Sequence, residues 1–261
     1  MFGFFKNRRR RKFRAMRFPD TWVAILEKNV PYYRYLPWDD QHELQQHMKV
    51  FLGEKHFEGC RGVRMTDEIR VTVAGQACTL LLHRDTDYFS SLVTILVYPS
   101  AFVVKTVVQH HETFLVHGEE ARDGEAWQRG VIVLAWDTVN DGFRHPHDGR
   151  NVILHEFAHQ LDLQNGDADG FPPDVPGALR PRWGQVLSAV YKELCETVER
   201  GRPTLLDPYG ATNPAEFFAV VTEYFFECPQ ALKMAHPELY DVLREYYRQD
   251  PDALYDAGKK N

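Results

Sequence analysis

The stretch Asn151-Val-Ile-Leu-His155-Glu156-Phe-Ala-His159-Gln-Leu-Asp162 is the most informative part of the chain. Two histidines four residues apart on a helix project from one face, so their imidazole nitrogens can reach one ion at zinc-ligand distances. Glu156 follows the first histidine, which places its carboxylate beside the ion. There it can accept a proton from a zinc-bound water and later pass it to a leaving amine. The pattern predicts a zinc site with a general base.

The sequence around these three residues predicts a buried helix. Asn151 is a suitable N-cap, and the positions between the polar residues are apolar. A buried helix that still carries His, Glu and His favours a metal site. The alternative is a pair of hydrogen-bonded core histidines.

An open catalytic zinc site needs a third protein ligand. The segment Asn213-Pro-Ala-Glu216-Phe-Phe-Ala-Val-Val-Thr-Glu223-Tyr opens a second helix with proline at its first position. Glu216 and Glu223 are two turns apart and share a face. Glu216 also has the spacing of a capping box with Asn213, so its carboxylate has an alternative role as a cap. Glu223 is instead expected as a surface residue or as a partner of a ligand histidine. Spacing favours Glu216 and leaves Glu223, or a histidine elsewhere, open.

The pattern outside these helices predicts an α+β fold with strands in the middle third of the chain and helices at both ends. The segments 68–83 and 130–139 have strand character, and residues 92–108 contain two apolar runs separated by Pro99-Ser100, as in a hairpin. Residues 118–129 have the composition of a loop. Helices are expected within 19–60, 151–163, 183–200, 213–227 and 238–248.

Composition and charge restrict the class of protein. The 261 residues carry a formal net charge of −6, so direct nucleic-acid binding by the whole protein is not expected. Residues 1–18 contain eight basic residues and no acid, which indicates a flexible, solvated arm; contact with acidic lipid, RNA or an acidic protein is the alternative. No segment approaches the roughly 20 apolar residues of a membrane helix, and no signal-peptide pattern occurs. The four scattered cysteines do not indicate disulfides or a thiolate zinc site. A cytoplasmic protein is expected.

Three segments of the chain resemble a known family. HEFAHQLD at 155–162, YGATNPAEFFAVVTEYFF at 209–226 and GEAWQRGVIVLAWDTV at 124–139 are similar to the Mlc titration factor A family of bacterial zinc peptidases. That family shares its active-site arrangement with the catalytic core of anthrax lethal factor. The resemblance runs from about Trp22 to Tyr247.

The resemblance implies a zincin-like (gluzincin) fold, with a small mixed sheet and the HExxH helix. The expected domain is 19–261, with a helical and strand part at 19–90 and a peptidase core at 91–250. Its implied ligands to one Zn²⁺ are His155, His159 and Glu216, with Glu156 as the general base. Tyr209, seven residues before Glu216, is implied as a hydrogen-bond donor to the oxyanion; from the sequence alone it is an ordinary loop tyrosine.

The implied activity is aminopeptidase-like hydrolysis of small peptides, and the implied partner is an Mlc-like transcriptional repressor that controls sugar uptake. A repressor-sequestering protein with a retained structural zinc site is the alternative function.

Other polar residues have weaker indications. Asp162 is a candidate to orient a ligand histidine, with a helix-end contact equally expected. His110-His111, His145 and His147 are expected as loop histidines. The strand predicted at 130–139 is a candidate edge for extended substrate.

Overall fold

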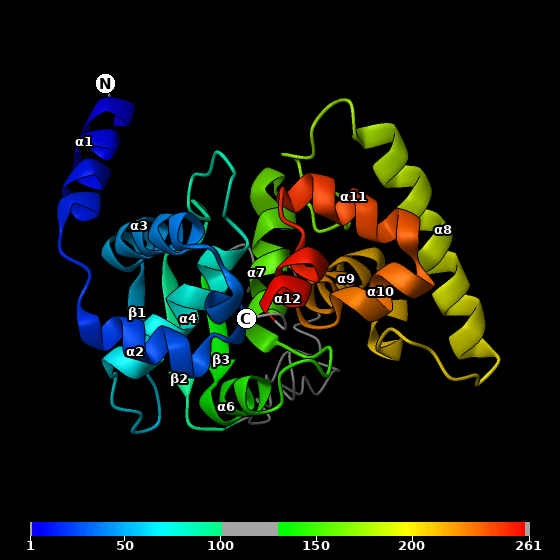
Figure 1. The fold of residues 1–261 in the computed structure, drawn as a ribbon, viewed down its shortest axis with the longest axis horizontal. Coiled ribbons are helices and arrows are strands. Elements are labelled where there is room, and N and C mark those ends of the chain that lie inside the picture. The colour runs from blue at the N-terminus through cyan, green and yellow to red at the C-terminus, as the bar shows by residue number, and fades with distance from the viewer. Residues whose placement is uncertain (1, 101–129, 259–261) are drawn as a thin grey trace, which may run out of the picture. The chain divides into compact units, whose positions relative to one another are not determined.

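The computed structural model describes residues 2–100 and 130–258, which divide into two compact units (Figure 1). Unit 1 consists of Met1–Leu82 and Thr86–Arg144, and unit 2 of His83–Asp85 and His145–Asn261. The single domain at 19–261 expected from the sequence, with parts at 19–90 and 91–250, stays a prediction. The four cysteines are free thiols. None of the helices in the described ranges combines the length and the apolar character needed to cross a membrane.

Unit 1 combines helices with a small sheet. Its elements are α1 (Phe2–Ala15), α2 (Asp20–Asn29), the 3-10 helix η1 (Pro31–Tyr35), α3 (Trp38–Glu54), β1 (His56–Gly59), α4 (Asp67–Thr79), β2 (Thr94–Tyr98), β3 (Val131–Ala135) and α6 (Trp136–Arg144).

The three described strands form a parallel sheet in the order β1-β2-β3. The expected mixed sheet stays a prediction, because the residues that would add an antiparallel strand lie outside the described ranges. Parallel neighbours need a crossover connection, and α4 lies in the crossover between β1 and β2. Ile95 and Ile132 are paired in register and buried, as expected for alternating strand residues. The predicted strand at 130–139 is half right, because the chain enters α6 at Trp136. The second strand of the predicted hairpin and the loop at 118–129 lie outside the described residues.

Residues 68–83 were predicted to have strand character and instead form most of α4. The helix begins after Thr66, whose hydroxyl accepts a hydrogen bond from the Ile69 backbone N–H at 3.3 Å. From Ile69 to Thr79 all residues except Arg70 are buried. The helix is therefore buried on nearly all sides, and burial outweighs the β-branched composition that favoured a strand.

The basic N-terminal segment forms α1 rather than the expected flexible arm. Arg10 is only 6% exposed, and its guanidinium binds the Glu54 carboxylate twice, each at 2.9 Å, and Asp87 Oδ1 at 2.8 Å. The ring of Phe13 fits against Gly53 of α3, where an added Cβ would lie 2.6 Å from it. The acids that neutralise Arg10 lie 44 and 77 residues away in the sequence, so the local pattern does not reveal them.

Unit 2 is helical. Its elements are α7 (Val152–Asp162), the 3-10 helix η2 (Leu163–Asn165), α8 (Arg180–Glu199), the 3-10 helix η3 (Pro208–Ala211), α9 (Pro214–Glu227), α10 (Pro229–Ala235), α11 (Pro237–Tyr247) and α12 (Pro251–Gly258). Figure 1 shows α7 and α9 side by side, and these two helices are in contact.

Aromatic side chains fill the core of unit 2. Trp183 of α8 is fully buried and contacts Phe218 of α9 and Tyr246 of α11 with ring centroids 5.7 and 4.9 Å apart. Aromatic pairs at these separations contribute roughly 0.5–1.5 kcal/mol beyond the area they bury. They attach α8 and α11 to the far side of α9 and leave α9 rigidly supported where it meets α7.

Candidate metal centre

The histidines of the HExxH segment lie on α7 as the sequence predicts. Asn151 is the N-cap, and its Oδ1 accepts a hydrogen bond from the Leu154 backbone N–H at 3.1 Å. His155 and His159 are 7% and 4% exposed, and their Nε2 atoms are 3.2 Å apart. The helix therefore presents two buried imidazoles to a common point.

Glu216 brings a carboxylate to the same point from α9. Its Oε2 lies 2.9 Å from His155 Nε2 and 3.3 Å from His159 Nε2. Asn213 does cap α9, because its Oδ1 accepts a hydrogen bond from the Glu216 backbone N–H at 2.9 Å. Only the backbone of Glu216 takes part in that cap, so its carboxylate is directed to the histidines.

Glu223 occupies a different position, behind His155. Its Oε1 lies 2.7 Å from His155 Nδ1, and its Oε2 accepts a hydrogen bond from the Asn151 backbone N–H at 2.5 Å. The two α9 carboxylates thus contact opposite nitrogens of one imidazole. Such a contact on Nδ1 fixes the tautomer and the ring orientation, leaving Nε2 free to bind an ion.

A third α9 carboxylate, Glu227, was not identified from the sequence. It is 7% exposed, and it accepts hydrogen bonds from Asn151 Nδ2 and from the His147 backbone N–H, both at 2.9 Å. The sequence did contain a signal for it. Glu216, Glu223 and Glu227 are seven and four residues apart in a mostly apolar helix, so all three carboxylates fall on one face. Glu227 thereby joins α9 to the cap of α7 and to the loop that carries the exposed His147, which is a loop histidine as expected.

The proposed base and oxyanion donor differ in their surroundings. Glu156 is 5% exposed, and burial raises its pKa to about 8 against the opposing influence of the His155 charge. Tyr209 lies in η3 with its ring centroid 6.1 Å from that of His155. Asp207 holds this turn, accepting hydrogen bonds from the Tyr209 backbone N–H and from the Arg150 guanidinium, both at 3.0 Å. Tyr209 is thus held near the histidines from the side of the α7 N-terminus.

The charges of the remaining groups follow from their contacts. Burial by itself would raise the pKa of Glu216, but its hydrogen bonds with His155 and His159 lower the pKa to about 2. For His155, burial is outweighed by the charge of Glu223 and by the contacts with both carboxylates, which hold its pKa well above the usual value. Burial lowers the pKa of His159. Glu216 is therefore an anion at neutral pH, the form that binds a cation.

Asp162 makes a helix-end contact, one of the two roles expected from the sequence. It is fully buried, and its Oδ2 accepts a hydrogen bond from the Gly170 backbone N–H at 2.7 Å. Gly170 has a φ of +75°, and a Cβ there would lie 2.4 Å from the Pro214 carbonyl oxygen. The loop after α7 is thus fastened against the start of α9, two residues before Glu216.

The donor set fits a zinc ion. A tetrahedral ion with ligands at about 2.0–2.1 Å places two ligand atoms roughly 3.3 Å apart, and the three separations here are 2.9, 3.2 and 3.3 Å. Two imidazole nitrogens and one carboxylate oxygen are characteristic zinc ligands. The alternative of hydrogen-bonded core histidines would have to include the anionic Glu216, whose Oε2 lies within hydrogen-bond distance of both Nε2 atoms. Of the other candidates, His110-His111 lie outside the described residues, and β3 belongs to unit 1.

Comparison with known proteins identifies the family. Residues 4–248 match the model of the glucose-regulated metallo-peptidase M90 family. The chain is 42% identical over 234 residues to the uncharacterized protein slr2042 of Synechocystis sp., covering 89% of this chain and 85% of that protein. It is 31% identical over 240 residues to Mlc titration factor A of Klebsiella pneumoniae, covering 88% and 89% of the two chains. Mlc titration factor A of Escherichia coli O1:K1 is also 31% identical, over 233 residues that cover 88% and 86%. The chain therefore belongs to this metallopeptidase family, that of Mlc titration factor A, as its motifs predicted.

Proposed function

We propose that the protein is a zinc-dependent peptidase with a zincin-like fold and a gluzincin-type site. One observation carries the proposal: ligand atoms of His155, His159 and Glu216 all lie within 4.8 Å of one another. The buried Glu156 carboxylate is adjacent to the first of them on α7. The three residues are the proposed ligands of a single Zn²⁺.

The remaining residues of the site have complementary roles in hydrolysis. Zinc, when bound, supplies a Lewis acid that polarises a carbonyl and makes water more acidic. Glu156 accepts a proton from the attacking water and delivers it to the amine that leaves when the peptide bond breaks. Tyr209 donates a hydrogen bond to the oxyanion that forms on the former carbonyl oxygen. Glu223 holds the His155 ring in the orientation that directs Nε2 to the ion.

The proposed substrates are small peptides with a free N-terminus, as the family resemblance implies. Cleavage of a panel of matched peptides with free and acetylated N-termini tests this specificity. Faster cleavage of the acetylated peptides would contradict the aminopeptidase proposal and leave an endopeptidase.

Two variants distinguish ligand from base. The purified protein is expected to contain about one zinc per chain, and Glu216→Ala is expected to lose it. Glu156→Gln keeps the shape of the side chain but cannot accept a proton, so zinc is retained while turnover falls by roughly 10²–10⁴-fold. Tyr209→Phe also retains zinc and shows a smaller loss of turnover. Normal turnover in Glu156→Gln, or full zinc content in Glu216→Ala, would refute the respective assignment.

A second proposed function is binding of an Mlc-like transcriptional repressor in the cytoplasm. It rests on the relatives named Mlc titration factor A, which match 88% of the chain. If this is the protein's sole function, the protein sequesters the repressor without hydrolysis, and its zinc site is structural. A folded repressor does not fit a site for extended peptides, so we place its docking surface outside the ligand triplet.

Glu156→Gln also tests whether binding and hydrolysis are separable. Titration against the purified repressor is expected to give a Kd within about threefold of the wild-type value, a difference below roughly 0.7 kcal/mol. Gel analysis of the same mixtures is expected to show an intact repressor. Loss of binding in the variant, or cleavage of the repressor by the wild type alone, would identify the repressor as a substrate.

A further inference from the structure

The outer face of α1 is strongly cationic. Arg8, Arg11 and Lys12 are exposed, and none has an ion-pair or hydrogen-bond partner within residues 2–100 and 130–258. By contrast, the buried Arg10 of the same helix is neutralised by Glu54 and Asp87. Three cations are therefore left available to an external anion.

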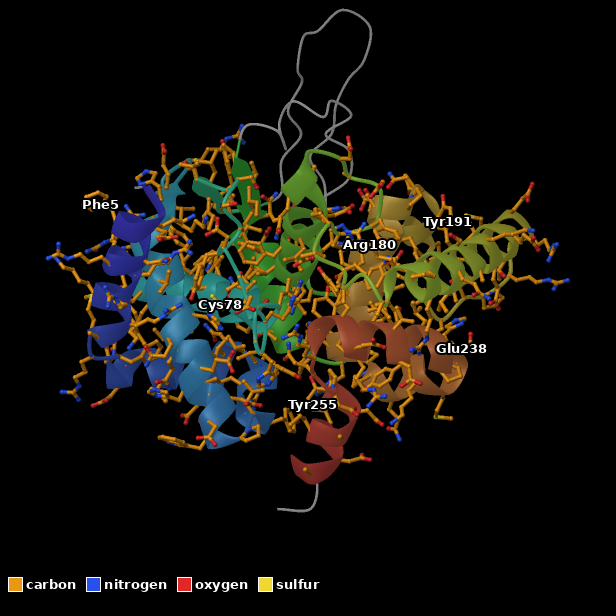
Figure 2. All side chains as sticks on the ribbon, turned by 90° about the horizontal axis from the view of Figure 1, so that it is seen from above. Phe5, Cys78, Arg180, Tyr191, Glu238 and Tyr255 are labelled. Carbon is orange, nitrogen blue, oxygen red and sulfur yellow. The ribbon has the colours of Figure 1, made fainter. Side chains whose placement is uncertain are left out.

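Helical spacing places these cations together with an exposed aromatic residue. Phe5, Arg8 and Lys12 are three and four residues apart and share a face. Arg10 lies two positions from both Arg8 and Lys12, about 200° around the helix, so the anchored side and the cationic side of α1 are opposite. Phe5 and Met16, near the two ends of α1, are each 61% exposed. Figures 1 and 2 show α1 at the margin of unit 1, with Phe5 labelled in Figure 2.

We propose that this face, formed by Phe5, Arg8, Arg11, Lys12 and Met16, docks on an anionic lipid surface. Basic side chains on the polar face of a helix are attracted to anionic headgroups, and flanking apolar side chains enter the boundary between headgroups and acyl chains. Nucleic-acid phosphates would use the cations but have no general need for the apolar residues at both ends.

The charge of the whole chain makes the attraction local. Residues 1–17 contain eight basic residues and no acid, so the rest of the chain has 23 basic and 37 acidic residues and a formal charge of −14. An anionic bilayer repels such a body and attracts only its basic helix. The proposed contact is thus peripheral and reversible, and it weakens as salt screens the charges.

Cosedimentation of the full chain with vesicles tests the proposal. The wild type is expected to bind vesicles that contain phosphatidylglycerol and not vesicles of phosphatidylcholine alone. Each basic residue near an anionic surface contributes roughly fivefold in affinity, so Arg8→Gln/Arg11→Gln/Lys12→Gln is expected to bind roughly 100-fold more weakly. Circular dichroism and thermal unfolding should match the wild type, because Arg10 remains.

The matched control removes three other exposed cations, in Arg34→Gln/Arg64→Gln/Arg202→Gln. It has the same net charge as the α1 variant, and its vesicle affinity is expected to stay within about threefold of wild type. Phe5→Ser/Met16→Ser is expected to weaken vesicle binding roughly tenfold without changing charge.

Three results would overturn the proposal. They are absence of wild-type binding to anionic vesicles, an equal loss in the control variant, and polyuridylate binding that is tighter than vesicle binding and unaffected by Phe5→Ser/Met16→Ser. The last would assign the face to nucleic acid. Peptidase activity is not measured in this experiment, so its outcome is independent of the proposed function.

Discussion

Replacing Glu223 tests whether the second carboxylate of α9 acts through His155 rather than on the metal. Each oxygen of Glu223 accepts one hydrogen bond, from His155 Nδ1 at 2.7 Å and from the Asn151 backbone N–H at 2.5 Å. Glutamine has the same shape but only one accepting oxygen. In Glu223→Gln one of the two donors therefore faces an NH₂ group, and in Glu223→Ala both lose their acceptor.

The expected magnitude follows from this count of hydrogen bonds. Loss of a group that orients a ligand histidine lowers metal affinity by roughly 10–100-fold, or about 1.4–2.8 kcal/mol. Glu223→Gln is expected near the lower bound and Glu223→Ala near the upper bound. Glu216→Ala removes one of the three donor atoms and is expected to lose far more affinity than either.

Competition with a chromogenic zinc chelator at neutral pH measures these affinities directly. Glu199→Gln is a suitable control, because it removes the same charge as Glu223→Gln. Glu199 is exposed at the end of α8. Thermal unfolding of the zinc-free proteins separates a change in folding from a change in affinity. Wild-type zinc affinity in a folded Glu223→Ala would refute the orienting role. A greater loss of affinity in Glu223→Ala than in Glu216→Ala would exchange the two assignments.

Two further predictions concern the stability of unit 1. Burial lowers the pKa of Lys55 from 10.5 to about 8. Between about pH 8 and pH 10.5 the unfolded chain therefore keeps a proton on Lys55 that the folded chain has lost. The free energy of unfolding should rise with pH over this range by up to about 3 kcal/mol. Urea unfolding of wild type and Lys55→Met between pH 7 and about 10.5 should show this rise only in the wild type, and parallel curves would contradict it. Arg10→Met leaves the Glu54 carboxylate, 7% exposed, without its main partner and should lower stability by about 3–5 kcal/mol. Arg10→Met/Glu54→Leu should recover part of that loss, whereas simple additivity of the two changes would show that the pair is not coupled.

Local patterns predicted the parts of the site that depend on one helix. The spacing of His155 and His159, the position of Glu156 and the cap at Asn151 require only the periodicity of α7. The choice between Glu216 and Glu223 was different, because both lie on one face of α9 and both contact His155. Which carboxylate meets Nε2 depends on the register between two helices that are about 60 residues apart in the sequence. Spacing favoured Glu216 but could not distinguish the two contacts.

The errors in the fold have similar physical causes. Residues 68–83 carry the β-branched composition of a strand, but they are buried on nearly all sides as a helix. The Thr66 cap and the two acids that follow it were the local signals for that helix. The helical structure of residues 2–15 and the burial of Arg10 were missed because its partners Glu54 and Asp87 are distant in sequence. In both segments tertiary contacts outweigh the local pattern.

The three glutamates of α9 explain how the site keeps its register. Along α9, Glu216 meets the two Nε2 atoms, Glu223 meets His155 Nδ1 and the Asn151 backbone, and Glu227 meets the Asn151 side chain and His147. Later residues of α9 thus contact earlier residues of unit 2's first helix and its cap, so the two helices run antiparallel. A shift of two turns would place Glu223 where Glu216 now lies. The Asn151 Nδ2 group donates its hydrogen bond to the Glu227 carboxylate. A shift of two turns would break this bond, so the bond opposes the shift. Glu227 accepts its hydrogen bonds from Asn151 and His147, and it therefore contributes to which carboxylate meets the two Nε2 atoms.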